Sequence, residues 1–588
     1  MSAYTAPLQD MRFALAEFAG LADLATLPGF EDASPELVDA VLEEAAKLTG
    51  KVIAPLNQVG DQHPSILENG AVRTPDGFRE AYARYRDDGW NSMPFSPDHG
   101  GQGLPWSVAM AVMEQIHAAN MSFGLCPTLN VAAVEAIEAH GTEEQKALYL
   151  HKLISGEWTG TMNLTEPQAG SDVGAIRAKA VPNGDGSYRI TGQKIYITYG
   201  EHDLADNIIH LVLARLPGAP DGTKGISLFV VPKFIPDAHG APGQRNDLRC
   251  VSLEHKLGIH ASPTAVMAYG DNEGAQGWLV GEENRGMACM FTMMNNARLA
   301  VGLQGVAIGE RAYQQARDYA VARVQSRAVT RPGDGAVAII HHPDVRRMLM
   351  AMRSQVEAGR ALTYYAVGAL DRSKRHPDQA ERQRAGALVD LLTPMVKAWC
   401  TDMGVEVASL GIQVHGGMGF IEETGAAQHY RDARITPIYE GTNGIQANDL
   451  VFRKVLRDDG AAAKALIAEM AAPLDGLSTI NRITDRLRAS LDDLHAATDW
   501  LLRTGKDNPI IAASVSAPYL KLFAITVGGW LMARAAAATS NGANPDFAEA
   551  KRATALFFAD QVMPQTVSLL PAIIEGAESV MALKVEQF

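Results

Sequence analysis

A carboxylate followed by glycine and two helix-capping residues, Glu440-Gly441-Thr442-Asn443, is the group in this chain best suited to chemistry. Gly441 has no side chain, so another molecule can approach the backbone closely. Thr442 or Asn443 can cap a helix expected to begin at Ile445. Glu440 is therefore predicted to lie on a loop that runs into a helix start. Taken alone, these residues are more typical of a solvated loop.

A second polar segment, residues 164–172, reads Leu-Thr-Glu-Pro-Gln-Ala-Gly-Ser-Asp. Two hydroxyls, a helix-incompatible proline and a glycine crowd a tight loop, which suits backbone hydrogen bonding to a polar ring or phosphate. A polar surface turn explains the same residues equally well. Further along, residues 192–198 read as an edge-like strand that contains Tyr196. By itself Tyr196 is more typical of a core residue than of a cofactor wall.

The patterning around these segments predicts four successive parts. Residues 1–158 show apolar residues at helical spacing, and 159–285 show short alternating runs that are typical of an antiparallel β domain. Helical spacing returns over 286–456, and the Ala- and Leu-rich residues 461–588 are predicted to form an added helical layer. The expected fold class is mainly α with a central antiparallel β domain.

The composition bounds the function. The 588 residues are too many for one hydrophobic core, so several domains are expected. The chain is 47% hydrophobic and 20% charged, an ordinary globular balance. The formal net charge of -15 argues against a nucleic-acid partner or an acidic membrane surface, because both would repel it. A local basic patch around an anionic cofactor remains compatible with this charge.

No metal site is predicted. The four cysteines are scattered at spacings that fit neither a metal site nor disulfides, so buried thiols in a reducing compartment are expected. They are Cys126, Cys250, Cys289 and Cys400. His341 and His342 are adjacent and point in different directions on a helix or its cap, so a structural role is expected for them.

A cytoplasmic protein without membrane insertion is expected. The N-terminal residues include acids and lack the basic leader and apolar core of a signal peptide. The most apolar run, 522–533, follows Lys521 and ends at Arg534, which is short of the roughly 20 residues needed to span a bilayer. A buried helix is predicted there.

Taken in order, these motifs resemble the acyl-CoA dehydrogenase family. The resemblance covers residues from about 30 to 456 and implies a helical domain, a β-barrel-like domain and a four-helix bundle. The matching segments are 97–103, 164–172, 192–198, 256–262, 296–298, 319–323, 413–420 and 439–442. The longer ends resemble the large subgroup, which includes 3-methylmercaptopropionyl-CoA dehydrogenases and favours a short or thioether-bearing acyl group.

The resemblance implies that Glu440 removes the α-proton of an acyl-CoA thioester while the β-hydride passes to flavin N5, giving a trans-2-enoyl-CoA. The backbone N–H of Glu440 and the flavin ribityl hydroxyl would stabilise charge on the thioester oxygen. Burial should raise the pKa of Glu440 towards the working pH. Some family branches place the base directly before Arg298, where this chain has Ala297, so Glu440 is the only candidate.

The resemblance also implies the binding residues. Thr198 is expected near flavin N5, and Arg323 at the pyrophosphate, often across a subunit interface. The residues expected to bind FAD are Met162, Asn163, Leu164, Thr165, Ser171, Tyr196, Ile197, Thr198, Arg323, Gln413, Gly416, Gly417 and Thr442. Those expected to bind substrate are Ser171, Arg298, Glu440 and Gly441. An inter-helix ion pair is the alternative for Arg298.

Three departures from the family pattern concern contacts, not the base. Tyr196 replaces the common Trp, which makes the flavin wall smaller and more polar. Gln325-Ser326 replaces a Gln/Thr-Phe pair, which weakens a phenylalanine contact. His260 replaces Arg, which leaves a CoA or interface contact in doubt.

Electrons are expected to leave to an electron-transfer flavoprotein. An acyl-CoA oxidase that uses oxygen is the first alternative, and a catalytically silent flavin-binding or assembly protein is the second. The added part 461–588 has no chemical constellation. We expect it to cover the bundle face that shorter members use to form tetramers, leaving a homodimer.

Overall fold

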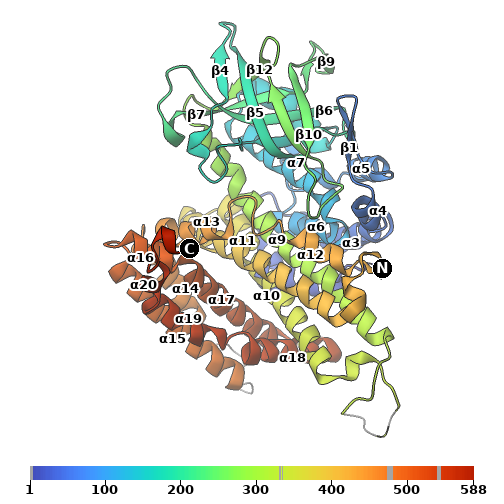
Figure 1. The fold of residues 1–588 in the computed structure, drawn as a ribbon, viewed down its shortest axis with the longest axis vertical. Helices are drawn as coiled ribbons and strands as arrows, with labels where there is room; N and C mark the ends of the chain where they lie inside the picture. The colour runs from blue at the N-terminus through green and yellow to red at the C-terminus, as the bar shows by residue number, and fades with distance from the viewer. Residues whose placement is uncertain (1–3, 330–332, 334, 473–480, 540–543) are drawn as a thin grey trace. The chain divides into compact units, whose positions relative to one another are not determined.

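The computed structural model describes residues 4–329, 333, 335–472, 481–539 and 544–588 (Figure 1). The chain forms two compact units. The first, called the helical unit, comprises Met1–Glu43, Trp106–Glu114 and Arg298–Phe588. The second, called the β unit, comprises Glu44–Pro105 and Gln115–Ala297. The four-part division stays a prediction, because each compact unit draws on more than one of those parts.

The β unit is built on an eight-stranded sheet with the order β10-β11-β5-β12-β7-β6-β3, and β4 pairs with β5 and β6 (Figure 1). Its strands are β3 (Trp158–Asn163), β4 (Lys179–Pro182), β5 (Ser187–Thr198), β6 (Asn207–Arg215), β7 (Ile226–Pro232), β10 (Leu248–Leu253), β11 (Thr264–Tyr269) and β12 (Ala275–Val280). The pairs β3–β6 and β4–β6 are parallel, and the other pairs in this sheet are antiparallel. The predicted β domain is confirmed, with two parallel pairs that the sequence did not indicate.

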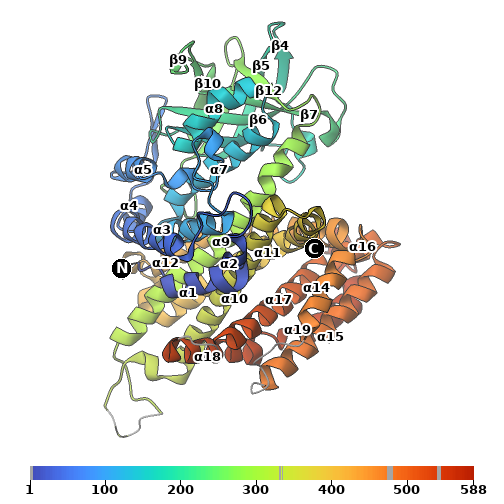
Figure 2. The same cartoon turned by 180° about the vertical axis from the view of Figure 1, so that it is seen from behind.

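The neighbouring strands β6 and β7 are buried along almost their whole length. Every residue of β7 is buried, as is all of β6 except its last residue. Phe229 and Val231 of β7 join Ile197 of β5 in one apolar core. Helix α7 (Met121–His140) packs against β3 (Figure 2). Two small hairpins complete the described strands: β1 (Ile66–Glu68) with β2 (Ala71–Arg73), and β8 (Phe234–Pro236) with β9 (Pro242–Arg245).

Three long helices dominate the helical unit: α9 (Gly286–Ala322, within this unit from Arg298), α10 (Pro343–Arg375) and α11 (Gln379–His415). Gly305 of α9 lies against the carbonyl of Cys400 in α11, where a β-carbon would clash. The absence of a side chain therefore allows α9 and α11 to run in direct contact.

The predicted added helical layer is present. It contains α14 (Ala461–Ala471), α15 (Asn481–Thr504), α16 (Pro509–Ser514), α17 (Ser516–Ala538), α18 (Pro545–Gln561) and α19 (Gln565–Ile574). Helix α17 packs against α10 and α11, and α18 also contacts α10 (Figure 1). Leu487, Leu494 and Leu501 form the buried stripe of α15, in agreement with the helical spacing of the sequence.

Helix α17 contains the apolar run predicted as a buried helix. It is long and apolar enough to cross a membrane by length and composition, but 83% of its apolar stretch is buried inside the protein. Arg534, near its C-terminal end, donates hydrogen bonds to Glu17. These features describe a core helix of the added layer.

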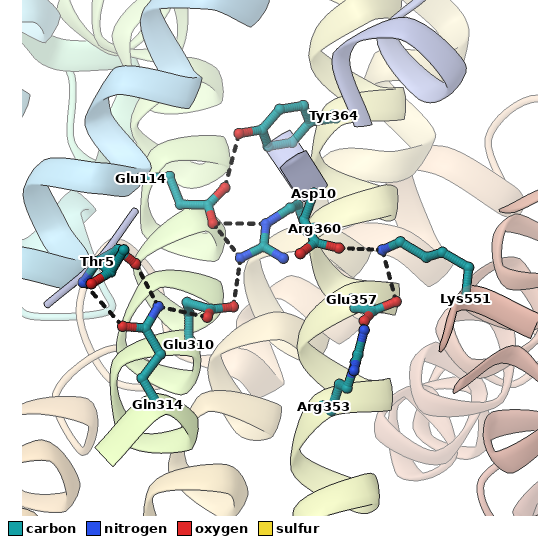
Figure 3. A network of polar contacts seen from close by, with 10 residues as sticks. All are labelled: Thr5, Asp10, Glu114, Glu310, Gln314, Arg353, Glu357, Arg360, Tyr364 and Lys551. Carbon is teal, nitrogen blue, oxygen red and sulfur yellow. Dashed lines mark hydrogen bonds and ion pairs between the residues drawn. The ribbon is translucent and has the colours of Figure 1, made fainter. Parts of the chain in front are cut away.

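A buried polar network joins the N-terminal segment, α10 and α18 (Figure 3). Arg360 of α10 donates to Glu114 and Glu310, and Tyr364 donates to Glu114. Lys551 of α18 pairs with Glu357 of α10 and with Asp10 of the N-terminal helix α1 (Leu8–Ala14). Buried charges are tolerated when they are paired and hydrogen-bonded, as these are.

Candidate active site

Glu440 and Gly441 both adopt left-handed backbone conformations, with φ of 55° and 84°. For a residue other than glycine this conformation costs roughly 1–2 kcal/mol, so the surrounding contacts must hold Glu440 in place. The amide of Gln446 donates to the carbonyls of Glu440 at 3.2 Å and Gly441 at 3.4 Å. These two hydrogen bonds therefore hold the backbone of the loop that carries the Glu440 carboxylate.

Thr442 caps the helix that follows this loop. Its hydroxyl accepts from the backbone N–H of Ile445 at 3.4 Å, and the helix α13 (Asn443–Asn448) begins at Asn443. The sequence predicted a start at Ile445, two residues later. The difference arises because Thr442 itself is the cap, so Asn443 becomes the first helical residue.

The carboxylate of Glu440 is partly buried and forms no hydrogen bond or ion pair with any described residue. Burial raises the pKa of Glu440 above its ordinary value, while the cations of Arg298 and Lys397 oppose this rise. The backbone N–H of Glu440 is also unbonded within the described ranges. A carboxylate of raised basicity beside a free N–H donor can accept a proton while the donor stabilises nearby negative charge.

Arg298 lies beside this loop on α9. Its Nη1 is 3.4 Å from Asp449 Oδ2, in the turn that continues from α13. The inter-helix ion pair given as the alternative for Arg298 is therefore present. A substrate role for Arg298 stays a prediction.

Lys397 also acts on Glu440, and its role was not predicted from the sequence. It is fully buried on α11, and its Nζ donates to Asn443 Oδ1 at 2.8 Å. The available signal was a single lysine inside the apolar helical stretch 391–400. Lysine is almost never fully buried unless it has a partner.

In the β unit, the polar loop and the strand β5 are joined by direct hydrogen bonds. Ile195 N–H donates to the Thr165 carbonyl at 3.0 Å. Lys194 Nζ donates to the Leu164 carbonyl at 2.9 Å and pairs with Glu166 Oε1 at 2.8 Å, with both side chains buried. Burial opposes ionisation of Glu166, but Lys194 and backbone donors keep its pKa below the ordinary value. Two segments singled out in the sequence are therefore neighbours.

Tyr196 stands at a bulge in β5. Its φ is 60°, and Ile195 and Tyr196 together lie opposite Val266 of β11, between the pairs Lys194–Met267 and Ile197–Ala265. A bulge redirects a side chain out of the regular alternation. Tyr196 is 61% exposed, so it lies at the surface and not in the core.

Thr165 and Thr198 lie on either side of these contacts, and both are half-buried. Their hydroxyls make no hydrogen bond to any residue that the structure describes, whereas the Thr198 carbonyl accepts from Thr161. Polar groups that are half-buried and unbonded suit a polar ligand. Ser171 is exposed on the same loop.

Three predicted residues turn their side chains inward. Asn163 is fully buried and bonds to Tyr269 and His210, and Met162 and Ile197 are also buried. Leu164 uses its carbonyl for Lys194. Any contact of Met162, Asn163 or Ile197 with a ligand must therefore come mainly from the backbone.

Arg323, Gln413, Gly416 and Gly417 form a separate, exposed group at the C-terminal ends of α9 and α11. These ends are joined by Tyr319 and His415, whose rings stack with centroids 4.4 Å apart. At about 1.5 Å per residue along α9, Arg323 lies roughly 35–40 Å from Arg298. Within the helical unit this group is therefore remote from Glu440.

His260 is held inside the β unit. Its Nδ1 lies 3.0 Å from Asp61 Oδ1 and 2.9 Å from the Asp61 carbonyl, and its Nε2 lies 2.9 Å from the Lys256 carbonyl. Because one ring nitrogen of His260 contacts Asp61 and the other contacts Lys256, this side chain connects the 256–262 loop to helix α4 (Leu56–Gln62). His342 similarly donates from Nε2 to the Gln325 carbonyl at 2.8 Å, beside the start of α10.

The chain matches the domains described as acyl-CoA dehydrogenase N-terminal domain over residues 39–157, middle domain over 161–271 and C-terminal domain over 284–454. A further match, acetyl-CoA dehydrogenase C-terminal like, covers residues 462–584 in the added helical layer.

Full-length relatives and a solved structure share this architecture. The chain is 49% identical to 3-methylmercaptopropionyl-CoA dehydrogenase of Ruegeria pomeroyi, over 98% of this chain and 99% of the relative. It is 35% identical to butyryl-CoA dehydrogenase of Syntrophomonas wolfei, over 100% and 99%. The structure of Caenorhabditis elegans ACDH-11 in complex with C11-CoA has a TM-score of 0.77 at 20% identity, with 97% of this chain and 95% of that chain covered.

The chain therefore belongs to the acyl-CoA dehydrogenase family, and it is an enzyme that dehydrogenates acyl-CoA thioesters. The named dehydrogenase relatives do not favour the oxidase alternative. Members of this family are flavoproteins, so a flavin is the implied cofactor.

Proposed function

We propose that the protein is an FAD-dependent dehydrogenase of short, thioether-bearing acyl-CoA, with 3-methylmercaptopropionyl-CoA as its preferred substrate and Glu440 as its base. The observation that carries this proposal is the loop of Glu440, which presents an unpaired carboxylate of raised pKa on a left-handed backbone. The substrate is supported by the relative from Ruegeria pomeroyi.

In the proposed reaction, the Glu440 carboxylate takes the α-proton of the thioester. Negative charge then develops on the thioester oxygen, and the free backbone N–H of Glu440 is placed to donate to it. Gly441 allows the thioester to come close to the backbone. When bound, FAD supplies the acceptor for the β-hydride.

The residues present fit FAD. The unbonded hydroxyls of Thr165 and Thr198 can hold the polar edge of a ring, and the exposed Tyr196 can pack on it. Arg323 has no carboxylate partner among the described residues and can pair with the pyrophosphate. Gly416 and Gly417 have open space around them, which allows close approach of the adenine end.

The remoteness of Arg323 from Glu440 supports a homodimer, in which Arg323 of one copy serves the cofactor of the other. The same end of the helical unit exposes Phe420 (84%), Val321, Val324 and Met418. An exposed apolar patch of this kind suits a subunit interface. Because α17 and α18 cover α10, the bundle face available for a tetramer is reduced. Sedimentation should give a dimer, and a compact tetramer would contradict this.

The electron acceptor is proposed to be an electron-transfer flavoprotein in the cytoplasm. Anaerobic titration of the holoprotein with a panel of acyl-CoAs tests the proposal through flavin absorbance. Bleaching by 3-methylmercaptopropionyl-CoA at lower concentration than by butyryl- or octanoyl-CoA is expected. No bleaching by any acyl-CoA would indicate the silent flavin-binding protein, and rapid hydrogen peroxide release in air would indicate the oxidase.

A further inference from the structure

The side chain of Asn443, three residues after Glu440, forms hydrogen bonds with α11 and so anchors the loop that carries Glu440. Its Nδ2 donates to Asp402 Oδ1 at 2.7 Å and to the Ala398 carbonyl at 3.1 Å, and lies 3.0 Å from Thr401 Oγ1. Its Oδ1 accepts from Lys397 Nζ at 2.8 Å. Thr442 provides the cap of α13, so the side chain of Asn443 is left for these contacts alone.

Lys397 is unusual among the cations of this chain. It is fully buried, and within the described ranges its only hydrogen bond is to the neutral amide of Asn443. By contrast, the other buried lysines, Lys194 and Lys551, each form an ion pair with a carboxylate. A buried ammonium without a paired carboxylate is costly, so a role is expected for its charge.

The charge of Lys397 acts electrostatically on the base. Glu440 and Asp402 are the carboxylates that act on Lys397, and Arg298 is the cation that acts on it. Arg298 is already paired with Asp449. Lys397 is thus the cation near Glu440 whose charge no other carboxylate directly neutralises.

We propose that Lys397 is a positioning residue for the catalytic base: it anchors the Glu440 loop through Asn443, and its charge keeps the Glu440 carboxylate ionised until the substrate is bound. This inference rests on the proposed function of Glu440. An ionised carboxylate is the form that accepts the α-proton, and a nearby cation favours that form. Burial lowers the pKa of Lys397 to about 7. The Lys397 ammonium is therefore charged below neutral pH, which is the range in which the Glu440 carboxylate tends to become protonated.

Helix α17 of the added C-terminal layer lies close to Asn443 and Asp402. A cavity of about 300 Å³ is lined by Asn443, Asp402, Trp399 and, from α17, Lys521. Burial raises the pKa of Asp402, while Asn443, Lys397 and Lys521 oppose the rise. Helix α17 therefore contributes one wall of the cavity that Asn443 and Asp402 also line.

The test compares three variants of Lys397 as FAD-loaded full-length protein. Lys397→Met removes donor and charge, Lys397→Gln keeps a donor without charge, and Lys397→Arg keeps the charge. The readout is the acid limb of kcat/KM against pH. The neutral variants are expected to move this limb upward by about 1 pH unit or more, and Lys397→Arg to restore it towards the wild-type position.

Lys551→Met is the matched control, because it removes another buried lysine of the helical unit without touching Glu440 or Asn443. It should leave the acid limb in place. The inference is overturned if Lys397→Gln or Lys397→Met keeps the wild-type limb, or if Lys397→Arg shifts it as far as the neutral variants. It is also overturned if all three fail to bind FAD while Lys551→Met binds it, since Lys397 would then serve folding only.

Glu440→Gln, measured in the same assay, distinguishes a failure of the proposed base from a failure of the proposed role of Lys397. If Glu440→Gln remains active, the proposed base is wrong. If Glu440→Gln is inactive and the Lys397 variants leave the limb unmoved, the proposed function stands and only the role of Lys397 fails.

Discussion

Lys194 and Glu166 form a buried ion pair in the β unit, with 2.8 Å between Nζ and Oε1. Lys194 also donates to the Leu164 carbonyl, so one ammonium holds the start of the polar loop, at residues 164 and 166, to β5. The half-buried hydroxyl of Thr165 owes its position to this pair, although Lys194 and Glu166 are both too deep to touch a ligand.

Lys194→Met should loosen this loop. It leaves the buried Glu166 without its cation, and breaking one side of a buried pair costs about 3–5 kcal/mol. We expect a lower Tm and a lower FAD content of the purified protein. Lys179→Met, at an exposed position of the same unit, should change neither. Unaltered FAD retention in Lys194→Met would contradict the role given to the pair.

Gly441→Ala should disturb the base loop. Gly441 has a φ of 84°, and a β-carbon there would lie 2.8 Å from the Gln446 amide that holds the loop. The left-handed backbone alone costs alanine about 1–2 kcal/mol. We expect kcat to fall at least tenfold, because the carboxylate is displaced. Gly444→Ala is the matched control, since Gly444 has open space around it, and its kcat should stay within twofold of wild type.

The pH dependence should follow the ionisation of Glu440. Burial raises its pKa above the ordinary 4.5, and the base acts only when ionised. Activity is therefore present above that raised pKa and is lost as pH falls through it. The acid limb of kcat/KM should lie above pH 4.5. A profile that stays flat down to pH 4.5, measured where the protein remains folded, would argue against a buried carboxylate base.

Lys551→Met should destabilise the protein without impairing chemistry. Lys551 pairs with Asp10 and Glu357, so its loss leaves Asp10 without this ion-pair partner and Glu357 with Arg353 alone (Figure 3). The expected loss in the free energy of unfolding is about 3–5 kcal/mol, read as a lower midpoint in urea. Lys464→Met, which removes an exposed lysine of α14, should leave the midpoint almost unchanged. An equal effect of both variants would contradict the importance of the network.

Local signals in the sequence predicted much of this architecture. Thr142 and Gln145 are three residues apart, a spacing that predicts a capping box, and they form one at the start of α8 (Glu143–Ser155). The strand predicted over 192–198 is longer than expected, since β5 runs from Ser187 to Thr198. The bulge at Tyr196 was not visible in the alternation of residues, since it depends on pairing with the distant Val266.

Among the residues of the site, too, only those that belong to local sequence motifs were predicted. Glu440, Thr442 and the 164–172 loop were found because their motifs are local in sequence. Lys397 was not found, because its role depends on a hydrogen bond to Asn443, which lies on a different helix. The role of His260 was equally hidden, since Asp61 and Lys256 define it only after folding.

The most direct measurement is anaerobic stopped-flow reduction of FAD-loaded Glu440→Gln by 3-methylmercaptopropionyl-CoA, beside wild type. We expect normal FAD content and substrate binding, with flavin reduction slowed by about 10²–10⁴-fold or more, because only the proton acceptor is removed. Reduction within tenfold of the wild-type rate would contradict the assignment of Glu440 as the base.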